Sequence, residues 1–212
     1  MSTRVSQVKA KNGEQAAQEI AEETTDRVFG LVDMTVVLAA TATIAAPVVA
    51  GVLVAYAANS LKARTHTGYW AALEEPSGLV FPLALRHSAF HVFNLVAGVA
   101  AFSLLRLGGG FEAAGPAVSL LAGSWVAHAL SYAARFALPS AAATAFSSAA
   151  AFLLAGATLR SAMLLVPATG GARWLPLTLL WSMVLQSGFQ AVVTLLTLSL
   201  NWSDLVSSHM AA

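Results

Sequence analysis

The chain has 212 residues, of which 58% are hydrophobic and only 10% are charged, with a formal net charge of +1 at pH 7. Soluble domains carry about 25% charged residues, and none of this length could bury so much apolar surface, so a water-soluble fold is excluded. The near-neutral charge gives no reason to expect nucleic-acid binding. The absence of cysteine excludes disulfides, c-type haem attachment and thiolate-bound zinc or iron–sulfur clusters.

Residues 1–30 are polar and mix basic with acidic side chains. A secretory signal has an apolar core close behind its basic start, and a transit peptide is poor in acidic residues, so neither pattern fits this segment. Ala16, Ile20, Thr24 and Val28 recur at i, i+4 spacing and predict a short surface helix. A disordered tail explains the same residues equally well.

Five apolar stretches follow, and each has at least the ~20 residues that a helix needs to cross about 30 Å of hydrocarbon. The sequence therefore predicts an all-α polytopic bundle in a lipid bilayer. Its five transmembrane helices occupy residues 31–202, and a short tail, 203–212, follows. The predicted spans are Leu31–Ala57, Leu79–Leu105, Pro116–Leu138, Ala141–Val166 and Leu175–Leu200.

Lysine and arginine suggest an orientation for these spans. Short loops make neighbouring spans antiparallel. With the N-terminus inside, seven basic residues lie on the inner side and four on the outer side, which favours this orientation. The inner residues are Arg4, Lys9, Lys11, Arg27, Arg106, Arg160 and Arg173, and the outer ones are Lys62, Arg64, Arg86 and Arg135. A bacterial inner membrane and a mitochondrial inner membrane both fit.

Small residues recur at four-residue spacing in the first and fourth spans. Such rows let helices approach closely in lipid, where no hydrophobic drive brings them together. The rows could join helices of this chain or dock on a partner, and an alanine-rich composition is the alternative explanation. The rows are Ala42, Ala46 and Ala50, and Ala141, Ala145 and Ala149.

Polar side chains form one stripe on each of the second, third and fifth spans. Spacings of three and four residues keep the members of a stripe on one helical face. Because polar groups in a bilayer face protein or water, the stripes are expected to face one another. The stripes are His87, His91, Asn94 and Gly98; Ser124, His128, Ser131 and Arg135; and Gln186, Gln190, Thr194 and Thr197.

The first explanation of the stripes is a haem b or a chlorophyll-type pigment. His91 and His128 lie at similar depth on antiparallel spans, and imidazoles from two helices can bind iron from opposite faces. Arg86 and Arg135 would then pair with the haem propionates, although Arg86 is also expected to reach the outer interface near Glu74 or Glu75. In architecture this resembles the membrane anchors of quinone-linked respiratory complexes, which implies electron transport in an energy-transducing membrane.

The second explanation makes the stripes hydrogen-bonded contacts between helices, each contributing about 0.6 kcal/mol. His87, Asn94, Ser124, Gln186 and Gln190 are then interior polar residues. This fits a non-catalytic accessory subunit that assembles with other membrane subunits, which is the function that we expect.

The third explanation is a proton or small-solute channel or transporter. Histidine could relay protons along such a path because it titrates near neutrality. Spans two to five contain no carboxylate, which disfavours it.

No motif for catalysis accompanies the stripes. The chain contains neither G-x-x-x-x-G-K-[ST] nor H-E-x-x-H, so a P-loop and zinc-protease chemistry are not expected. His87 and His91 have the spacing of a helical metal pair, but no carboxylate lies near them in that span. Every lysine lies outside the spans, which excludes a retinal Schiff base. We therefore do not expect an enzyme.

Overall fold

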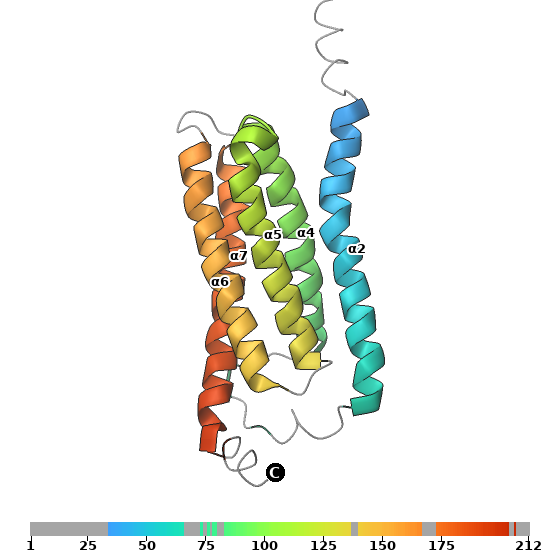
Figure 1. Ribbon diagram of the computed structural model, residues 1–212, viewed down its shortest axis with the longest axis vertical. Helices are drawn as coiled ribbons and strands as arrows, with labels where there is room; N and C mark the ends of the chain where they lie inside the picture. Colours follow the sequence, from blue (N-terminus) through green and yellow to red (C-terminus); the bar gives the residue numbers. More distant parts are fainter. Residues whose placement is uncertain are drawn as a thin grey trace, which may run out of the picture. The chain divides into compact units, whose positions relative to one another are not determined.

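The computed structural model describes residues 34–65, 73, 76, 78–79, 83–136, 140–166, 173–203 and 206. Within these residues the chain is helical and has no strand. Each of the five long helices holds an apolar stretch of 24 to 27 residues, enough to cross a bilayer. The predicted all-α membrane bundle is thereby confirmed. The helices are α2 (Met34–Thr65), α4 (Leu83–Leu107), α5 (Phe111–Phe136), α6 (Ala141–Leu165) and α7 (Trp174–Leu200) (Figure 1).

The chain forms two compact units, residues 1–41 and residues 42–212. Of the first unit, the structure describes only the opening residues of α2, 34–41. The surface helix expected within residues 1–30 lies outside the described residues, as does most of the tail, 203–212. All further description concerns the second unit.

A glycine turn joins α4 to α5 and sets the start of α5. Gly109 and Gly110 have φ of 82° and 89°, which is the left-handed conformation that glycine adopts readily. The amide of Gly110 donates to the carbonyl of Leu105 at 2.9 Å and so closes the end of α4. The expected start at Pro116 is five residues late, because α5 begins at Phe111 and includes this proline. The amide hydrogen that proline lacks would have bonded the carbonyl of Glu112, which lies in the first turn of α5. The proline therefore removes one hydrogen bond at the start of the helix.

The start of α6 is set by a side-chain cap. Ser140 has an extended backbone, with φ of −140° and ψ of 101°, and its Oγ accepts the amide of Ala143 at 3.1 Å. A serine cap of this kind contributes about 1 kcal/mol.

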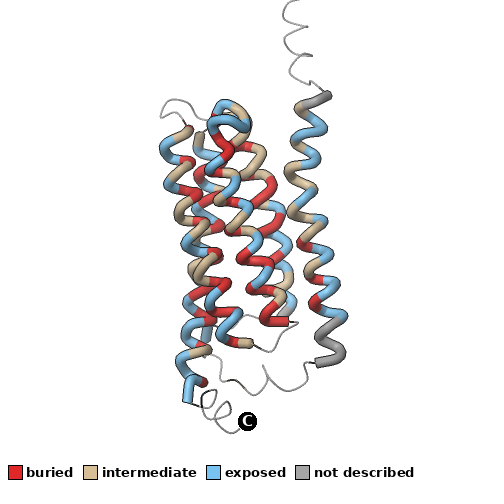
Figure 2. Tube along the Cα trace, viewed as in Figure 1, coloured by how far each residue is buried: buried red, intermediate tan, exposed pale blue. Residues whose placement is uncertain are grey.

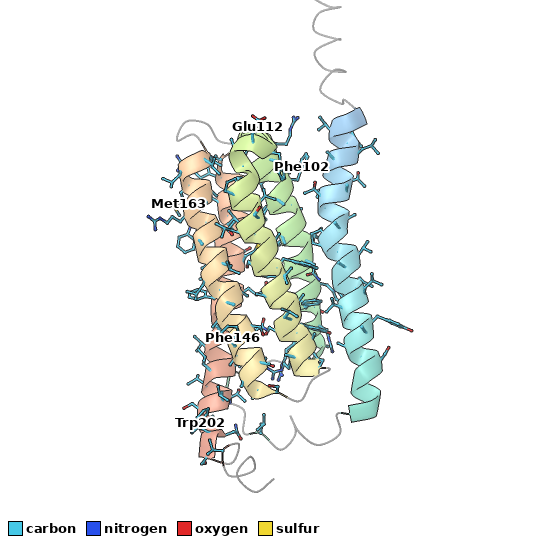
Figure 3. The ribbon with its side chains drawn as sticks, viewed as in Figure 1. Phe102, Glu112, Phe146, Met163 and Trp202 are labelled. Carbon is cyan, nitrogen blue, oxygen red and sulfur yellow. The ribbon has the colours of Figure 1, made fainter. Side chains whose placement is uncertain are left out.

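At the other end of the bundle from Glu112, Trp202 follows α7 (Figure 3). Its ring is 59% exposed, which suits a tryptophan at a membrane interface.

Helices α4 to α7 form a four-helix bundle in which α5 packs against α4 and α6, and α7 packs against the same two helices. Their buried residues follow the inward faces (Figure 2). Outward side chains such as Phe146 and Met163 are exposed, as a lipid-facing surface requires (Figure 3). The alanine row that begins at Ala141 is turned inward, since Ala141 and Ala145 are buried and Ala149 is partly buried.

Helix α2 belongs to this unit from residue 42 onward and packs loosely on α4. Only 6% of its apolar stretch is buried, against 39% to 50% for the other four helices. Contact occurs where side chains are small: a Cβ added to Gly98 would lie 2.7 Å from the Cα of Ile44. One added to Gly51 would lie 1.9 Å from the Nδ2 of Asn94. Ala42 and Ala46 are exposed, so this row does not make the contact.

The two halves of the four-helix bundle differ in character. Where α4 and α6 end and α5 and α7 begin, twelve buried apolar residues form a continuous core, with Phe93, Leu104, Leu121, Leu180 and Met183 as its bulky members. A smaller aromatic cluster occupies the half where α4 begins and α5 ends. The polar side chains gather in this second half, and the candidate site lies there.

Candidate functional site

A cavity of about 320 Å³ lies between α4, α5 and α7, in the half of the bundle where α4 begins and α5 ends. This volume is at the lower end of the range for small-molecule pockets, about 300–1,000 Å³. Antiparallel packing brings the first turns of α4 beside the last turns of α5, so residues distant in sequence meet there. Six polar residues line the cavity: Arg86, His128, Tyr132, Arg135, Gln186 and Gln190.

The α5 wall of the cavity is aromatic and is joined to α4 by a polar contact. The Tyr132 hydroxyl forms a hydrogen bond with Nδ1 of His87. The His87 ring also stacks on Phe136, with ring centroids 4.9 Å apart. Phe90 stacks on Tyr132 at 4.0 Å. These rings lock the two helices together at the depth of the cavity, and they fix the direction in which the Tyr132 hydroxyl points.

His128 is held between phenylalanine rings of α4. Its ring stacks on Phe93 at a centroid distance of 3.9 Å and lies 5.7 Å from Phe90. The residue is only 3% exposed, and its Nδ1 has no hydrogen-bond partner within the described structure. A buried polar atom left in this state costs about 1–3 kcal/mol. The imidazole therefore sits at the cavity wall at an energetic cost that the fold does not offset locally.

The two glutamines of α7 are fixed to neighbouring helices. Gln186 donates through Nε2 to the carbonyl of Ala89 in α4 at 2.8 Å. Gln190 donates to the hydroxyl of Ser131 in α5 at 3.0 Å, and this hydroxyl also contacts that of Ser148 in α6 at 2.6 Å. The glutamine side chains thus form the α7 wall in defined positions, and they also tie α7 to α4 and α5.

Two further residues of the predicted stripes join helices without lining the cavity. Asn94 is fully buried, and its Oδ1 accepts the indole Nε1 of Trp125 at 2.8 Å. Ser124 is also fully buried and donates to the carbonyl of Ala151 in α6 at 2.9 Å. These bonds are structural contacts between α4 and α5 and between α5 and α6.

Two arginines line the cavity. Arg135 comes from the last turn of α5 and is 8% exposed, and Arg86 comes from the first turn of α4 and is half-buried. Among the described residues, thirteen line the cavity and none of these is acidic. Glu74 and Glu75, which Arg86 is expected to approach, lie outside the described residues. Two guanidinium groups in a low-dielectric setting attract anions much more strongly than they would in water.

The structure does not bring His91 and His128 together. His91 is exposed on the outside of α4, where its ring meets the edge of Phe90 at 5.7 Å, and it is absent from the cavity lining. His128 lines the cavity together with Arg86 and Arg135. Axial ligands must reach the iron from its two opposite faces, so a haem held between these two histidines does not fit this arrangement.

Within the described part of the chain, no three histidine or acidic side chains gather as a metal site would require. The aromatic residues of the cavity were not singled out from the sequence, although Tyr132 lies four residues after His128 and so shares its helical face.

No family model, curated protein or solved structure matches the chain.

Proposed function

We propose that this chain is a non-catalytic, integral membrane subunit of a larger membrane complex. The observation that supports the proposal is the exposure of His91. It lies seven residues beyond Ala84, where the apolar stretch of α4 begins, which is about 10 Å along the helix. Ionisable side chains at such depth are costly in lipid and normally face protein or water. A helix of another subunit packed on this face of α4 would cover the imidazole and give it a hydrogen-bond partner.

The loose packing of α2 is consistent with this role. Only 6% of its apolar stretch is buried within the chain. Lipid covers an apolar helix without penalty, so this helix would be stable without a partner. An exposed imidazole differs because lipid offers it no hydrogen bond. For this reason the proposal depends on His91 and not on the apolar surface of α2.

The sequence left a channel or transporter open, and the arrangement of the bundle favours it less. The cavity occupies one half of the four-helix bundle. In the other half, Phe93, Leu104, Leu121 and Leu180 fill the space between the helices and are at most 2% exposed. A polar path through the described helices would have to cross this core. The cavity therefore suits retention of a molecule better than its passage.

The proposal is tested by extracting the tagged chain from its native membrane in mild detergent and measuring the mass and composition of the complex. We expect a complex of fixed stoichiometry with other polypeptides, which His91→Leu dissociates. Ser88→Ala is the matched control, because Ser88 is exposed on the same helix and its hydroxyl already bonds the carbonyl of Ala84 at 3.0 Å. A wild-type chain that is extracted alone, or a complex that His91→Leu leaves intact, would contradict the proposal.

The stability of the purified chain supplies a second test. His91→Leu removes a polar ring from the lipid-facing surface, so the isolated chain should be as stable as wild type or more stable. A visible spectrum of the same sample checks the separation of the two histidines. A Soret band that disappears in both His91→Ala and His128→Ala would show that these residues do meet at a haem.

A further inference from the structure

The cavity between α4, α5 and α7 has a chemistry that the proposed subunit role does not use. All of its described lining residues except Leu79 belong to the apolar stretches of these three helices, so the cavity lies at membrane depth. We propose that it binds a neutral aromatic molecule with a hydroxyl group, a phenol, taken from the surrounding lipid. The α4 and α5 walls assign the aromatic ring, and the α7 wall assigns the hydroxyl group.

Four rings form a ladder that alternates between α4 and α5. Phe93 stacks on His128 at a centroid distance of 3.9 Å. Phe90 follows at 5.7 Å from His128 and stacks in turn on Tyr132 at 4.0 Å. Successive planes differ by only 18° to 21°, so the rings cover one another's faces. Three of them, Phe90, His128 and Tyr132, line the cavity and therefore meet it with their edges.

Ring edges of this kind favour an aromatic ligand over an alkyl chain. The edge of an aromatic ring carries partial positive charge and its face partial negative charge, so edges attract the face of another ring. A saturated ligand of the same size would gain only the burial of apolar area. The volume fits as well: an apolar cavity of about 150 Å³ holds benzene, so the 320 Å³ found here leaves room for two fused rings.

The α7 wall places two amide groups on the cavity. Gln186 and Gln190 line it and are partly exposed, and both donate through Nε2 to a neighbouring helix. The acceptor of Gln186 is the carbonyl of Ala89, at 2.8 Å. Because a carbonyl only accepts, this bond fixes the amide nitrogen toward α4 and defines the other end of the amide as the acceptor Oε1. Among the described residues, none donates to this oxygen.

An uncharged hydroxyl group is the donor that complements Oε1 of Gln186. An acceptor without a donor is costly away from water, and a phenol supplies the donor without bringing a charge into the membrane. An ammonium group would also donate, but the amide oxygen has no charge to offset it. Arg86 and Arg135 line the cavity too, and both already interact with other groups of the chain, so no ligand contact is assigned to them.

A phenol can enter from lipid between α4 and α7. Leu85 of α4 and Phe189 of α7 line the cavity and are also 51% and 39% exposed. These two helices are neighbours, so the cavity reaches the lipid-facing surface between them. The ring ladder and the hydrogen bond between Tyr132 and His87 fix the α5 wall before a ligand binds. Binding then requires little ordering of the protein.

The experiment uses the purified chain in nanodiscs of phosphatidylcholine and 2-naphthol as the probe. Bound 2-naphthol is measured by equilibrium dialysis against nanodiscs without protein, which subtracts its partition into lipid. We expect saturable binding at a single site per chain. Two analogues should each bind roughly fivefold more weakly at equal concentration in the lipid. They are 2-methoxynaphthalene, which keeps the oxygen but cannot donate, and decahydro-2-naphthol, which keeps the hydroxyl group but has no aromatic ring.

A substitution in α7 locates the hydroxyl contact. Gln186→Leu should weaken binding of 2-naphthol roughly fivefold and leave that of 2-methoxynaphthalene unchanged, so that the two ligands bind alike. A merely structural role of Gln186 would weaken both ligands equally. Ser182→Ala is the matched control and should change neither affinity. Ser182 is exposed on the same helix, does not line the cavity and bonds the carbonyl of Leu179 at 2.7 Å.

Four results would overturn the proposal. They are the absence of saturable binding of 2-naphthol, equal affinity of the wild-type chain for 2-naphthol and either analogue, an equal loss of both naphthalene ligands in Gln186→Leu, and tighter binding of 2-naphthoate or 2-naphthylmethylammonium, which would indicate a site for a charged molecule. If Gln186→Leu does not fold, as judged by its thermal unfolding, the comparison of ligands on the wild-type chain still decides. Because the experiment uses the isolated chain, its outcome does not depend on whether the chain is a subunit of a larger complex.

Discussion

The contact between α2 and α4 depends on the absence of a side chain at Gly98. A Cβ added there would lie 2.7 Å from the Cα and 2.8 Å from the carbonyl oxygen of Ile44. Both are backbone atoms, which cannot rotate away as the end of a side chain can. Overpacking of this kind costs about 1–3 kcal/mol. Since α2 has few other contacts, Gly98→Ala should separate the two helices and lower the free energy of unfolding by about 2 kcal/mol.

The measurement is unfolding of the purified chain by detergent titration, with the free energy taken from the transition. Gly156→Ala in α6 is the matched control, because nothing lies within 4 Å of the added Cβ. Replacing a helical glycine by alanine is otherwise favourable by roughly 0.5–1 kcal/mol, so this control should unfold no more easily than wild type. Equal stabilities for the two variants would refute the reasoning, since α2 would then not be seated against α4 at this position.

Three other substitutions test separate parts of the fold by the same titration. Gly110→Ala should lower the free energy of unfolding by about 1–2 kcal/mol, because φ is 89° and alanine is strained in the left-handed conformation. No atom crowds the added Cβ, so this backbone strain is the whole expected cost. A wild-type free energy of unfolding would contradict the left-handed turn. Ser131→Ala should cost about 1 kcal/mol, and a double-mutant cycle with Gln190→Leu should give a coupling of about 0.6 kcal/mol; additive effects would mean that this hydrogen bond contributes nothing. Phe93→Ala should cost about 3 kcal/mol, because its ring is fully buried, whereas Phe146→Ala, at 79% exposure, should have little effect; similar losses would contradict the assigned core.

The spans could be predicted because they depend on length and apolarity alone. α6 and α7 begin and end within one residue of the expected positions. α5 was placed less well at its start, since Pro116 was taken as the first residue and the structure includes it in the second turn. Inside a helix, proline removes one hydrogen bond and its ring crowds the carbonyl four residues earlier, which here is that of Glu112 in the first turn of α5. Near a membrane interface water can satisfy that carbonyl.

The depth of the polar residues could also be predicted, and their direction could not. The contacts of His128 with Phe90 and Phe93, and the hydrogen bond between Trp125 and Asn94, correspond to the antiparallel register that the sequence suggested. Direction is harder because residues advance by about 100° each, so His91 and Asn94 lie about 60° apart within one stripe. That angle is enough to bury Asn94 and to leave His91 outside.

The cavity lay beyond the reach of sequence patterns. It consists of space that three helices leave unfilled, and its size depends on how side chains of α4, α5 and α7 interdigitate. Phenylalanines such as Phe90 and Phe189 have the same appearance in sequence whether they face lipid, core or a cavity. Arg135 gave a partial signal, since a charged residue inside a span is a candidate functional residue by its cost alone.

The division of the bundle into two halves explains how a fold with an unfilled polar cavity can still be stable. In lipid, helices associate through close packing and not through exclusion of water. The apolar half supplies that packing with twelve buried residues, so the other half can accommodate charge and empty volume. Stability should then depend mainly on the apolar half, and Gly110→Ala, at the turn that closes this half, should weaken the fold.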